Sequence, residues 1–228
     1  MSKISLIFYW VFFAVLNLKA SEYEITVLAT NTANFGGIGE WSFSALLESD
    51  DEKILFDTGF NENTVFHNAN LLGKDLSQVE KVILSHFHGD HTGGLIKLRK
   101  TFKEINPKAF STVYVADGFF EQRYDENGEL RGFIGGFNDV DNFLKETDDL
   151  GIRFVILKEP IEISKNLYLS GPVERIHERV VVSPGFYLKK DGLLLDDLVL
   201  DDQSLGILTK KGWYMMSGCG HAGMINTA

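Results

Sequence analysis

Three histidines and one aspartate fall within six residues of this chain, in the order His86, His88, Asp90 and His91. The two-residue spacing of His86 and His88 lets both imidazoles point to one side of a short extended segment. Asp90 and His91 come from the start of a following helix and can face a neighbouring point. Nitrogen and oxygen donors at this density suit zinc, or iron or manganese in a similar site. A merely solvated loop is disfavoured, because unpaired His and Asp beside a buried strand cost free energy.

An apolar strand and a helix are expected to position this motif. Val82-Ile83-Leu84 indicates a buried strand over Lys81–Ser85, and Thr92–Phe102 has the spacing of an amphipathic helix. Three glycines lie in or next to the motif and, lacking Cβ atoms, are expected to let the backbone pass close to metal ions: Gly89, Gly93 and Gly94.

The rest of the chain alternates between strand-like and helix-like patterns. Further strands are expected at Glu24–Ala29, Trp41–Leu47, Lys53–Phe56, Thr112–Ala116, Arg153–Leu157, Ile161–Ile163 and Leu167–Ser170, with a hairpin at Leu205–Thr209 and Trp213–Ser217. Further helices are expected at Asn63–Leu72 and Val140–Thr147. Many strands with interspersed helices indicate an α/β fold, a layered sandwich of sheets and helices.

Composition narrows the class of protein. The 228 residues suffice for one domain, and their formal charge of -10 disfavours a nucleic-acid partner. Cys219 is the one cysteine in the sequence, so no internal disulfide and no CxxC site can form.

The N-terminus resembles a secretory signal peptide over residues 1–20. Lys3 supplies a positive charge, Leu6–Leu16 is uninterruptedly apolar, and Ala20 offers a small residue for cleavage before Ser21. The apolar run is shorter than the roughly 20 residues that span a membrane, so no stable span is expected after cleavage. Export to the periplasm or beyond is therefore predicted, with an uncleaved N-terminal membrane anchor as the alternative, and residues 21–228 form the remaining domain.

The motif carries a family resemblance. His86-x-His88-x-Asp90-His91, preceded by Asp57-Thr58-Gly59, resembles the metallo-β-lactamase superfamily. The segments SHFHGDHTGGL and SGCGHAGMINT are similar to one branch in particular, the dihydropteridine-ribofuranosyl-aminobenzene-phosphate synthase-like proteins. The resemblance implies an αββα sandwich with a dinuclear metal site at one edge. It also implies further strand, helix and a last histidine after the His221 segment, so the domain is expected to lack its C-terminal end.

The resemblance also implies ligand roles. His86 and His88 would bind the first of two divalent metal ions, and His221 would complete that site. Asp90 and His91 would bind the second ion. Zinc is the expected metal, with iron or manganese as alternatives.

Two further residues are assigned by the same resemblance. Cys219 lies where related enzymes place a metal-bridging carboxylate; a thiolate could serve there, and a buried structural cysteine is the alternative. Asp57 would not touch metal but would accept hydrogen bonds that hold the motif loop in register.

Other histidines and charged residues are weighed separately. His177 is expected at the surface and His67 in helix packing, so neither is a predicted ligand. The acidic pairs Asp196-Asp197 and Asp201-Asp202 are expected on the solvated surface, with calcium binding as a lesser option.

The aromatic segment Phe119–Phe133 allows two interpretations. It could form a lid over the site, with Arg123 or Arg131 holding an anionic group. It could equally be a cluster that packs a long loop.

Two adjacent cations can share a water and lower its pKa, and the resulting hydroxide attacks an electrophilic centre. Asp90 is then both ligand and proton acceptor. The sequence therefore predicts an exported, metal-dependent hydrolase acting on an ester, lactone or phosphoester bond of a small, anionic or neutral molecule. The branch name implies a synthase of pterin-cofactor assembly, a pathway in which an exported chain is poorly placed. The alternatives are a non-catalytic metal- or ligand-binding sensor and an iron redox protein.

Overall fold

A computed structural model describes residues 23–132, 134–177 and 184–228. The signal peptide expected at residues 1–20 lies outside the described residues and stays a prediction. Within the described ranges, none of the helices combines the length and the apolar character needed to cross a membrane.

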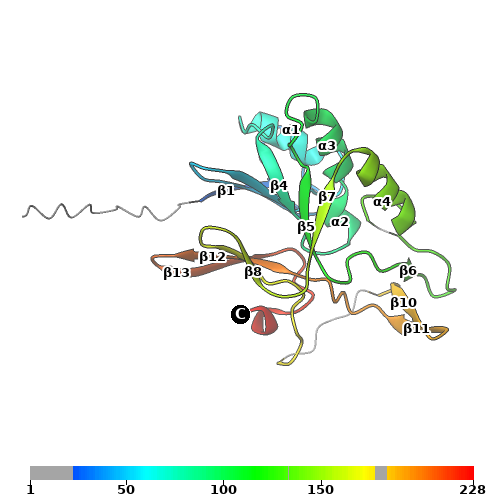
Figure 1. The fold of residues 1–228 in the computed structure, drawn as a ribbon. Helices are drawn as coiled ribbons and strands as arrows, with labels where there is room; N and C mark the ends of the chain where they lie inside the picture. The colour runs from blue at the N-terminus through cyan, green and yellow to red at the C-terminus, as the bar shows by residue number, and fades with distance from the viewer. Residues whose placement is uncertain (1–22, 133, 178–183) are drawn as a thin grey trace, which may run out of the picture.

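A six-stranded mixed sheet forms the centre of the molecule (Figure 1). Its strands run in the order β1-β2-β3-β4-β5-β7, with β1 Glu24–Ala29, β2 Ser44–Glu48, β3 Lys53–Phe56, β4 Val79–Ile83, β5 Thr112–Ala116 and β7 Arg153–Leu157. The first three strands pair antiparallel, and β3, β4, β5 and β7 pair parallel. The parallel strands end at one edge of the sheet, and the metal motif directly follows β4.

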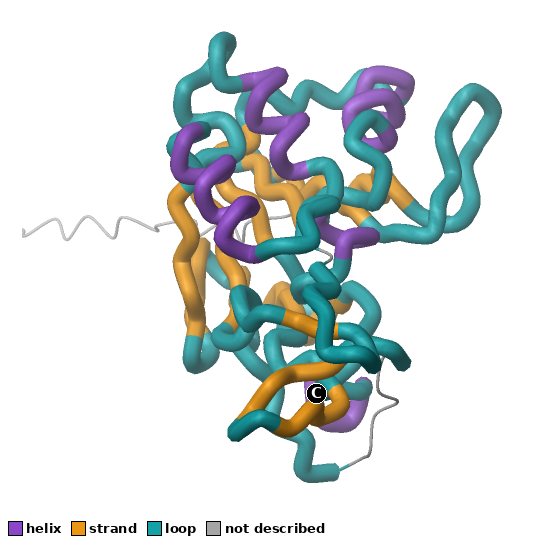
Figure 2. Tube along the Cα trace, turned by 90° about the vertical axis from the view of Figure 1, so that its right-hand side faces the viewer, coloured by secondary structure: helices purple, strands orange, loops and turns teal. Residues whose placement is uncertain are grey.

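Helices cover one face of this sheet (Figure 1): α1 Thr64–Leu71, α3 Leu95–Phe102 and α4 Val140–Asp149. Figure 2 shows them gathered on the same side of the strands. In α3, Leu95, Leu98 and Phe102 follow helical spacing and are buried, so one apolar stripe faces the sheet. In α4, the Asp139 side chain accepts a hydrogen bond from the Asp141 N–H (2.8 Å) and caps the helix.

A second sheet packs on the other face of the first. Its order is β13-β12-β9-β8, with β8 Ile161–Ser164, β9 Leu167–Leu169, β12 Ser204–Thr209 and β13 Gly212–Ser217. Alternation along β3 explains the two layers, because Leu55 is buried on the helical side while Ile54 and Phe56 pack toward the second sheet. The short helix α5, Met224–Thr227, lies beyond the second sheet (Figure 1). The α/β sandwich expected from the sequence is confirmed.

A small third sheet was not predicted. It has the order β11-β10-β6, with β6 Arg123–Tyr124, β10 Tyr187–Lys190 and β11 Leu193–Asp196. It pairs the segment expected to be a loop or lid with residues more than sixty positions later, and it carries Arg123 into the protein interior.

The predicted helix over residues 92–102 begins only at Leu95, as α3, and a separate one-turn helix, α2 Gly89–Thr92, precedes it. A Cβ atom on Gly93 would lie 2.0 Å from the Phe60 carbonyl oxygen, and one on Gly94 would lie 2.2 Å from the Thr58 oxygen. These glycines therefore admit the neighbouring Asp57–Phe60 loop, which corrects the expectation that they make room for metal ions. Trp41 lies in a loop, because β2 begins only at Ser44.

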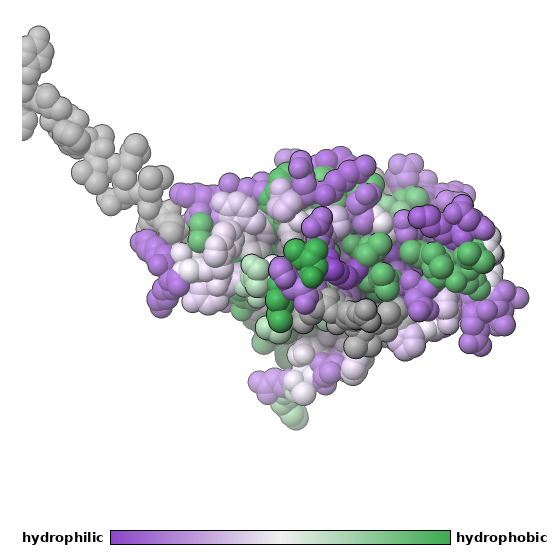
Figure 3. All heavy atoms as spheres, turned by 90° about the horizontal axis from the view of Figure 1, so that it is seen from below, coloured by the Kyte–Doolittle hydropathy of each residue, from purple (hydrophilic) through white to green (hydrophobic). Residues whose placement is uncertain are grey.

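Exposed apolar side chains are spread over several elements. Figure 3 shows hydrophobic groups in separate patches, divided by hydrophilic ones, on the face seen from below. Large exposed examples include Trp213 and Tyr214 of β13 and Met224 and Ile225 of α5. Exposure alone therefore does not mark a binding surface in this protein.

Candidate metal centre

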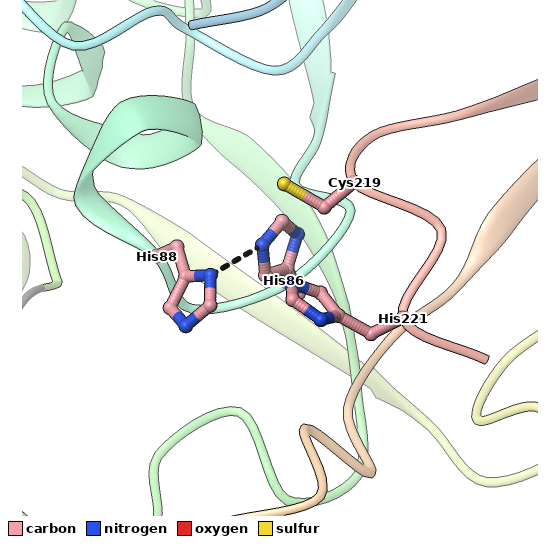
Figure 4. Close-up of side chains that lie close together, drawn as sticks. All are labelled: His86, His88, Cys219 and His221. Carbon is pink, nitrogen blue, oxygen red and sulfur yellow. Dashed lines mark hydrogen bonds between the residues drawn. The ribbon is translucent and has the colours of Figure 1, made fainter. Parts of the chain in front are cut away.

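Four predicted ligands converge at the edge of the sandwich. One donor atom from each of His86, His88, Cys219 and His221 lies within 4.8 Å of the others. Figure 4 shows these side chains close together, with His86 and His88 from the segment after β4 and Cys219 and His221 from the loop after β13. His86 Nε2 lies 2.9 Å from His88 Nδ1.

A second group adjoins the first. Donor atoms of Asp90, His91 and Cys219 also lie within 4.8 Å of one another. Cys219 belongs to both groups, and its Sγ lies 3.2 Å from His91 Nε2. The alternative of a buried structural cysteine is wrong, because Cys219 is exposed. All six residues predicted as ligands are thus brought together.

The buried carboxylate of Asp57 holds the motif loop through hydrogen bonds. Its Oδ1 accepts a hydrogen bond from the Ser85 N–H (2.7 Å), and its Oδ2 accepts one from the Ser85 hydroxyl (2.8 Å). Oδ2 also lies 2.7 Å from His91 Nδ1. Asp57 is fully buried, and the expectation that it accepts hydrogen bonds from this loop is confirmed.

Burial keeps three of the histidines neutral. It lowers the pKa of His86 well below its usual value, the pKa of His88 to about 3 and that of His221 to about 4, and the neighbouring histidines act in the same direction. Neutral imidazole is the form that binds metal. His221 Nε2 is buried and has no hydrogen-bond partner among the described residues. These donors therefore fit a divalent metal ion.

His91 behaves differently. Burial acts to lower its pKa, but the Asp57 carboxylate and further hydrogen bonds raise that pKa well above its usual value. A carboxylate on the far nitrogen of a metal-binding histidine fixes its ring and makes it a stronger donor. Asp57 therefore both orients His91 and increases its basicity.

The prediction of solvated surface holds for Asp196, which is exposed, but is wrong for the other three residues of the two acidic pairs. Asp197, Asp201 and Asp202 are buried. Arg123 Nε lies 2.9 Å from Asp197 Oδ2, and Arg123 Nη2 lies 2.9 Å from Asp201 Oδ1. The Arg123 guanidinium neutralises two of these carboxylates, Asp197 and Asp201, so it takes the place of the calcium ion that was the lesser option.

This ion-pair cluster supports the metal motif at Phe87, a different residue from those that Asp57 contacts. Asp201 Oδ2 accepts a hydrogen bond from the Phe87 N–H (2.8 Å), and Arg123 Cζ lies 3.7 Å from the centroid of the Phe87 ring. Phe87 separates His86 from His88. Sequence reasoning missed this support, since Phe87 and Asp201 are 114 positions apart and nothing local marks their pairing.

The expectation that Arg123 could hold an anionic group of a substrate is wrong, because its side chain is buried and forms an ion pair with Asp197. Arg131 donates from Nη1 to the Gly185 carbonyl oxygen (2.7 Å). Phe119 is buried, and Phe120 packs edge-on against Phe154. These contacts favour the interpretation of a packed loop over that of a lid; Phe133 lies outside the described residues.

The two remaining histidines lie outside the donor groups, as predicted. His67 is exposed, so the expectation that it packs in the helix interface is wrong, and its Nε2 lies 2.8 Å from the Gly36 carbonyl oxygen. His177 is also exposed, and its backbone N–H donates to Asn226 Oδ1 (2.7 Å).

A cavity of about 400 Å³ opens on the donor groups. Its lining combines four predicted ligands with three aromatic side chains: His88, Asp90, Cys219, His221, Trp41, Phe60 and Phe186. A small molecule in this cavity would lie directly against the donor atoms.

A layered sandwich with these donor groups at the ends of its strands defines a class of protein. The family model of the metallo-beta-lactamase superfamily matches residues 42–223, and the chain belongs to that superfamily. Members of this superfamily bind divalent metals.

Individual relatives point to one branch. The chain is 30% identical over 219 residues to the 7,8-dihydropterin-6-methyl-4-(beta-D-ribofuranosyl)-aminobenzene-5'-phosphate synthase of Methanocaldococcus jannaschii, covering 91% of this chain and 71% of that protein. It is 33% identical to the uncharacterized protein MJ0448 of the same organism, covering 89% and 71% of the two chains. Among solved structures, it is similar to Tm1679, described as a metal-dependent hydrolase of the beta-lactamase superfamily, with a TM-score of 0.67, 29% identity and coverage of 90% and 69%. The resemblance to this branch is confirmed.

Proposed function

We propose that the protein is a dinuclear metal-dependent hydrolase that cleaves an ester, lactone or phosphoester bond. The observation that carries the proposal is the pair of donor groups that share Cys219 and face one cavity. The superfamily match and the similarity to a metal-dependent hydrolase support it.

In this proposal each donor group holds one ion, with Cys219 common to both: His86, His88 and His221 in the first group, and Asp90 and His91 in the second. A thiolate with imidazoles favours zinc, and iron is the next choice. When bound, such ions polarise the bond to be cleaved and lower the pKa of water toward neutrality.

Asp90 is the residue that we assign to proton transfer. It lines the cavity and its Oδ2 lies 3.5 Å from His91 Nε2. Burial acts to raise its pKa, but the hydrogen bond and charge of His91 lower the pKa below the usual value. Its position in the cavity lining beside the donor atoms is what would let its carboxylate accept a proton from an attacking water.

The test starts from metal-free protein reloaded with zinc, manganese or iron. Bound metal is counted by mass spectrometry, and turnover is measured with 4-nitrophenyl acetate, a γ-lactone and bis(4-nitrophenyl) phosphate. Turnover of at least one substrate that depends on bound metal is expected. His88→Ala should lose both metal and turnover, whereas His67→Ala should lose neither, because His67 is an exposed histidine outside the donor groups.

Two other outcomes would change the assignment. Protein that holds two metal equivalents yet hydrolyses no substrate would be a binding or sensor protein. The 30% identity to a synthase favours group transfer as the second candidate. It would be indicated by turnover that requires an added acceptor other than water.

Export is part of the proposal and rests on residues 1–20 alone. A fusion of residues 1–25 to alkaline phosphatase lacking its own signal should become active outside the cytoplasm. Activity that is lost when Leu6–Leu16 is interrupted by two lysines would support export, and an inactive fusion would contradict it.

A further inference from the structure

Two exposed aromatic rings line the cavity at the donor groups. Trp41 is 77% exposed and Phe60 is 52% exposed. Trp41 comes from the loop before β2, and Phe60 comes from the loop after β3. Exposed aromatic rings occur elsewhere in this protein, but these two face the same cavity as four predicted ligands.

Glu40 ties the two loops together. Its Oε1 accepts hydrogen bonds from the Phe60 N–H (2.8 Å) and the Ser42 hydroxyl (2.7 Å). Its Oε2 accepts hydrogen bonds from the Asn61 N–H (3.1 Å) and the Thr64 hydroxyl (2.8 Å). The Glu40 carboxylate thus connects the loop that carries Trp41 to the loop that carries Phe60. These hydrogen bonds hold the backbone beneath both rings in place.

Phe186 supplies a third aromatic wall. Its ring lies 5.3 Å from the His88 ring and 5.7 Å from the Phe87 ring, centroid to centroid. Arg131 Cζ lies 4.4 Å from the centroid of the same ring. Packing between the metal motif and a guanidinium holds this wall in place, and the residue is only 9% exposed.

The charge of the lining indicates the kind of group that fits. Among the described residues that line the cavity, none is Lys or Arg. Apart from the predicted ligands, the lining consists of aromatic rings. An anionic part of a substrate would therefore find its partners at the metal ions, and the aromatic walls suit a flat, uncharged ring.

We propose that the substrate carries an aromatic ring next to the bond that is cleaved, that this ring packs on Trp41 and Phe60, and that Glu40 positions both walls. The inference rests on the proposed function, because it places the reacting bond at the metal ions. It narrows the substrates to aryl or aryl-bearing esters, lactones or phosphoesters.

Calorimetric binding of phenylphosphonate and methylphosphonate to the zinc-loaded protein tests the inference without turnover. The two ligands share the metal-binding anion and differ in the ring. We expect phenylphosphonate to bind about tenfold more tightly. Trp41→Ala and Phe60→Ala should each reduce this ratio severalfold, while the zinc content stays at the wild-type value.

Two further variants make the test specific. Trp213→Ala is the matched control, because Trp213 is also exposed but lies on β13, outside the cavity lining, and it should leave the ratio unchanged. Glu40→Gln keeps one acceptor oxygen and replaces the other by an NH₂ group that cannot accept. It should lower the ratio with zinc content unchanged, and a ratio at the wild-type value would overturn the role of Glu40.

The possible failures are distinguishable. Equal binding of both phosphonates would overturn the aromatic subsite and leave the hydrolase proposal standing. Absence of binding by either ligand, to protein that holds two zinc equivalents, would overturn the proposed access of substrate to the metals and the subsite with it.

Discussion

Arg123 and Asp201 form a buried ion pair, with 2.9 Å between Nη2 and Oδ1, and the second oxygen of Asp201 holds the backbone of Phe87. The metal motif is therefore supported by two buried carboxylates: by Asp57 at Ser85 and His91, and by Asp201 at Phe87. Since Phe87 lies between His86 and His88, a charge buried far along the chain determines the path of the loop that presents two predicted ligands.

Replacing Arg123 should disturb both stability and metal binding. Arg123→Met leaves Asp197 and Asp201 buried without their cation, which costs about 3–5 kcal/mol of unfolding free energy. Because Asp201 also positions Phe87, zinc affinity should fall about 10–100-fold. Urea unfolding and competition with a zinc chelator measure the two effects.

Arg99→Met is the matched control. Arg99 is equally buried, at 4% exposure, and donates to the carbonyl oxygens of Leu150, Pro107 and Ala109. Its loss should destabilise the fold while zinc affinity stays at the wild-type value. Equal zinc affinity in the two variants would show that Arg123 supports only the fold.

Asp57→Asn tests the support from the other carboxylate. An amide can still accept from the Ser85 N–H, but it cannot give His91 a carboxylate partner, so the second donor group should lose affinity about 10–100-fold. We expect the bound metal to drop from two equivalents to one after dialysis against dilute zinc. Two tightly held equivalents in the variant would contradict this role for Asp57.

Asp202 gives the metal-free protein a pH-dependent stability. Burial raises its pKa to about 7 and the Asp201 charge acts in the same direction, whereas the Ala222 N–H and Arg175 lower it. Since the unfolded side chain titrates near 3.8, the folded state binds the extra proton, and the contribution of Asp202 to the free energy of unfolding falls as pH rises from about 4 to about 7.

Asp202→Asn removes this dependence while keeping an acceptor for the Ala222 N–H, which donates to Oδ2 (2.7 Å) in the native protein. In urea unfolding at pH 5, 6, 7 and 8, the free energy of unfolding of the variant minus that of the wild type should increase as pH rises from 5 to 7. The dependence that remains combines Asp201, whose pKa burial raises to about 6, with His86, His88 and His221, whose lowered pKa values make the free energy of unfolding rise with pH below about 6.5. Identical slopes in variant and wild type would rule out Asp202 as the titrating group.

The predicted metal ligands could be recognised in the sequence, whereas most of the side chains that hold those ligands in place could not. His86, His88, Asp90 and His91 form one local motif, so their types and spacing suffice to propose a metal site. Most strands of the two main sheets follow from alternation and apolar runs, as Leu55 illustrates in β3.

Local sequence patterns did not predict the contacts between residues that are far apart in the chain. Acidic residues such as Asp197 and Asp201 are most often solvated, and only the fold brings Arg123 against them. Nothing in the sequence around Glu40 indicates that its two oxygens accept hydrogen bonds from Phe60 and Thr64, about twenty positions later. The exposure of Cys219 likewise depends on tertiary placement.

Replacing Cys219 tests whether the protein binds one metal ion or two. Cys219→Ala removes the donor that both groups share, so we expect the variant to retain less than one equivalent of zinc in the Asp90–His91 group, which keeps only two donors. Cys219→Asp restores an oxygen donor and should bind two ions, with the preference shifted from zinc toward manganese, because carboxylates suit harder metals than thiolates do.

Substitution with cobalt gives a direct readout, since a sulfur-to-metal charge-transfer band should be present in the wild type and absent in both variants. A wild-type protein that binds two cobalt ions without that band would show that Cys219 is not a ligand.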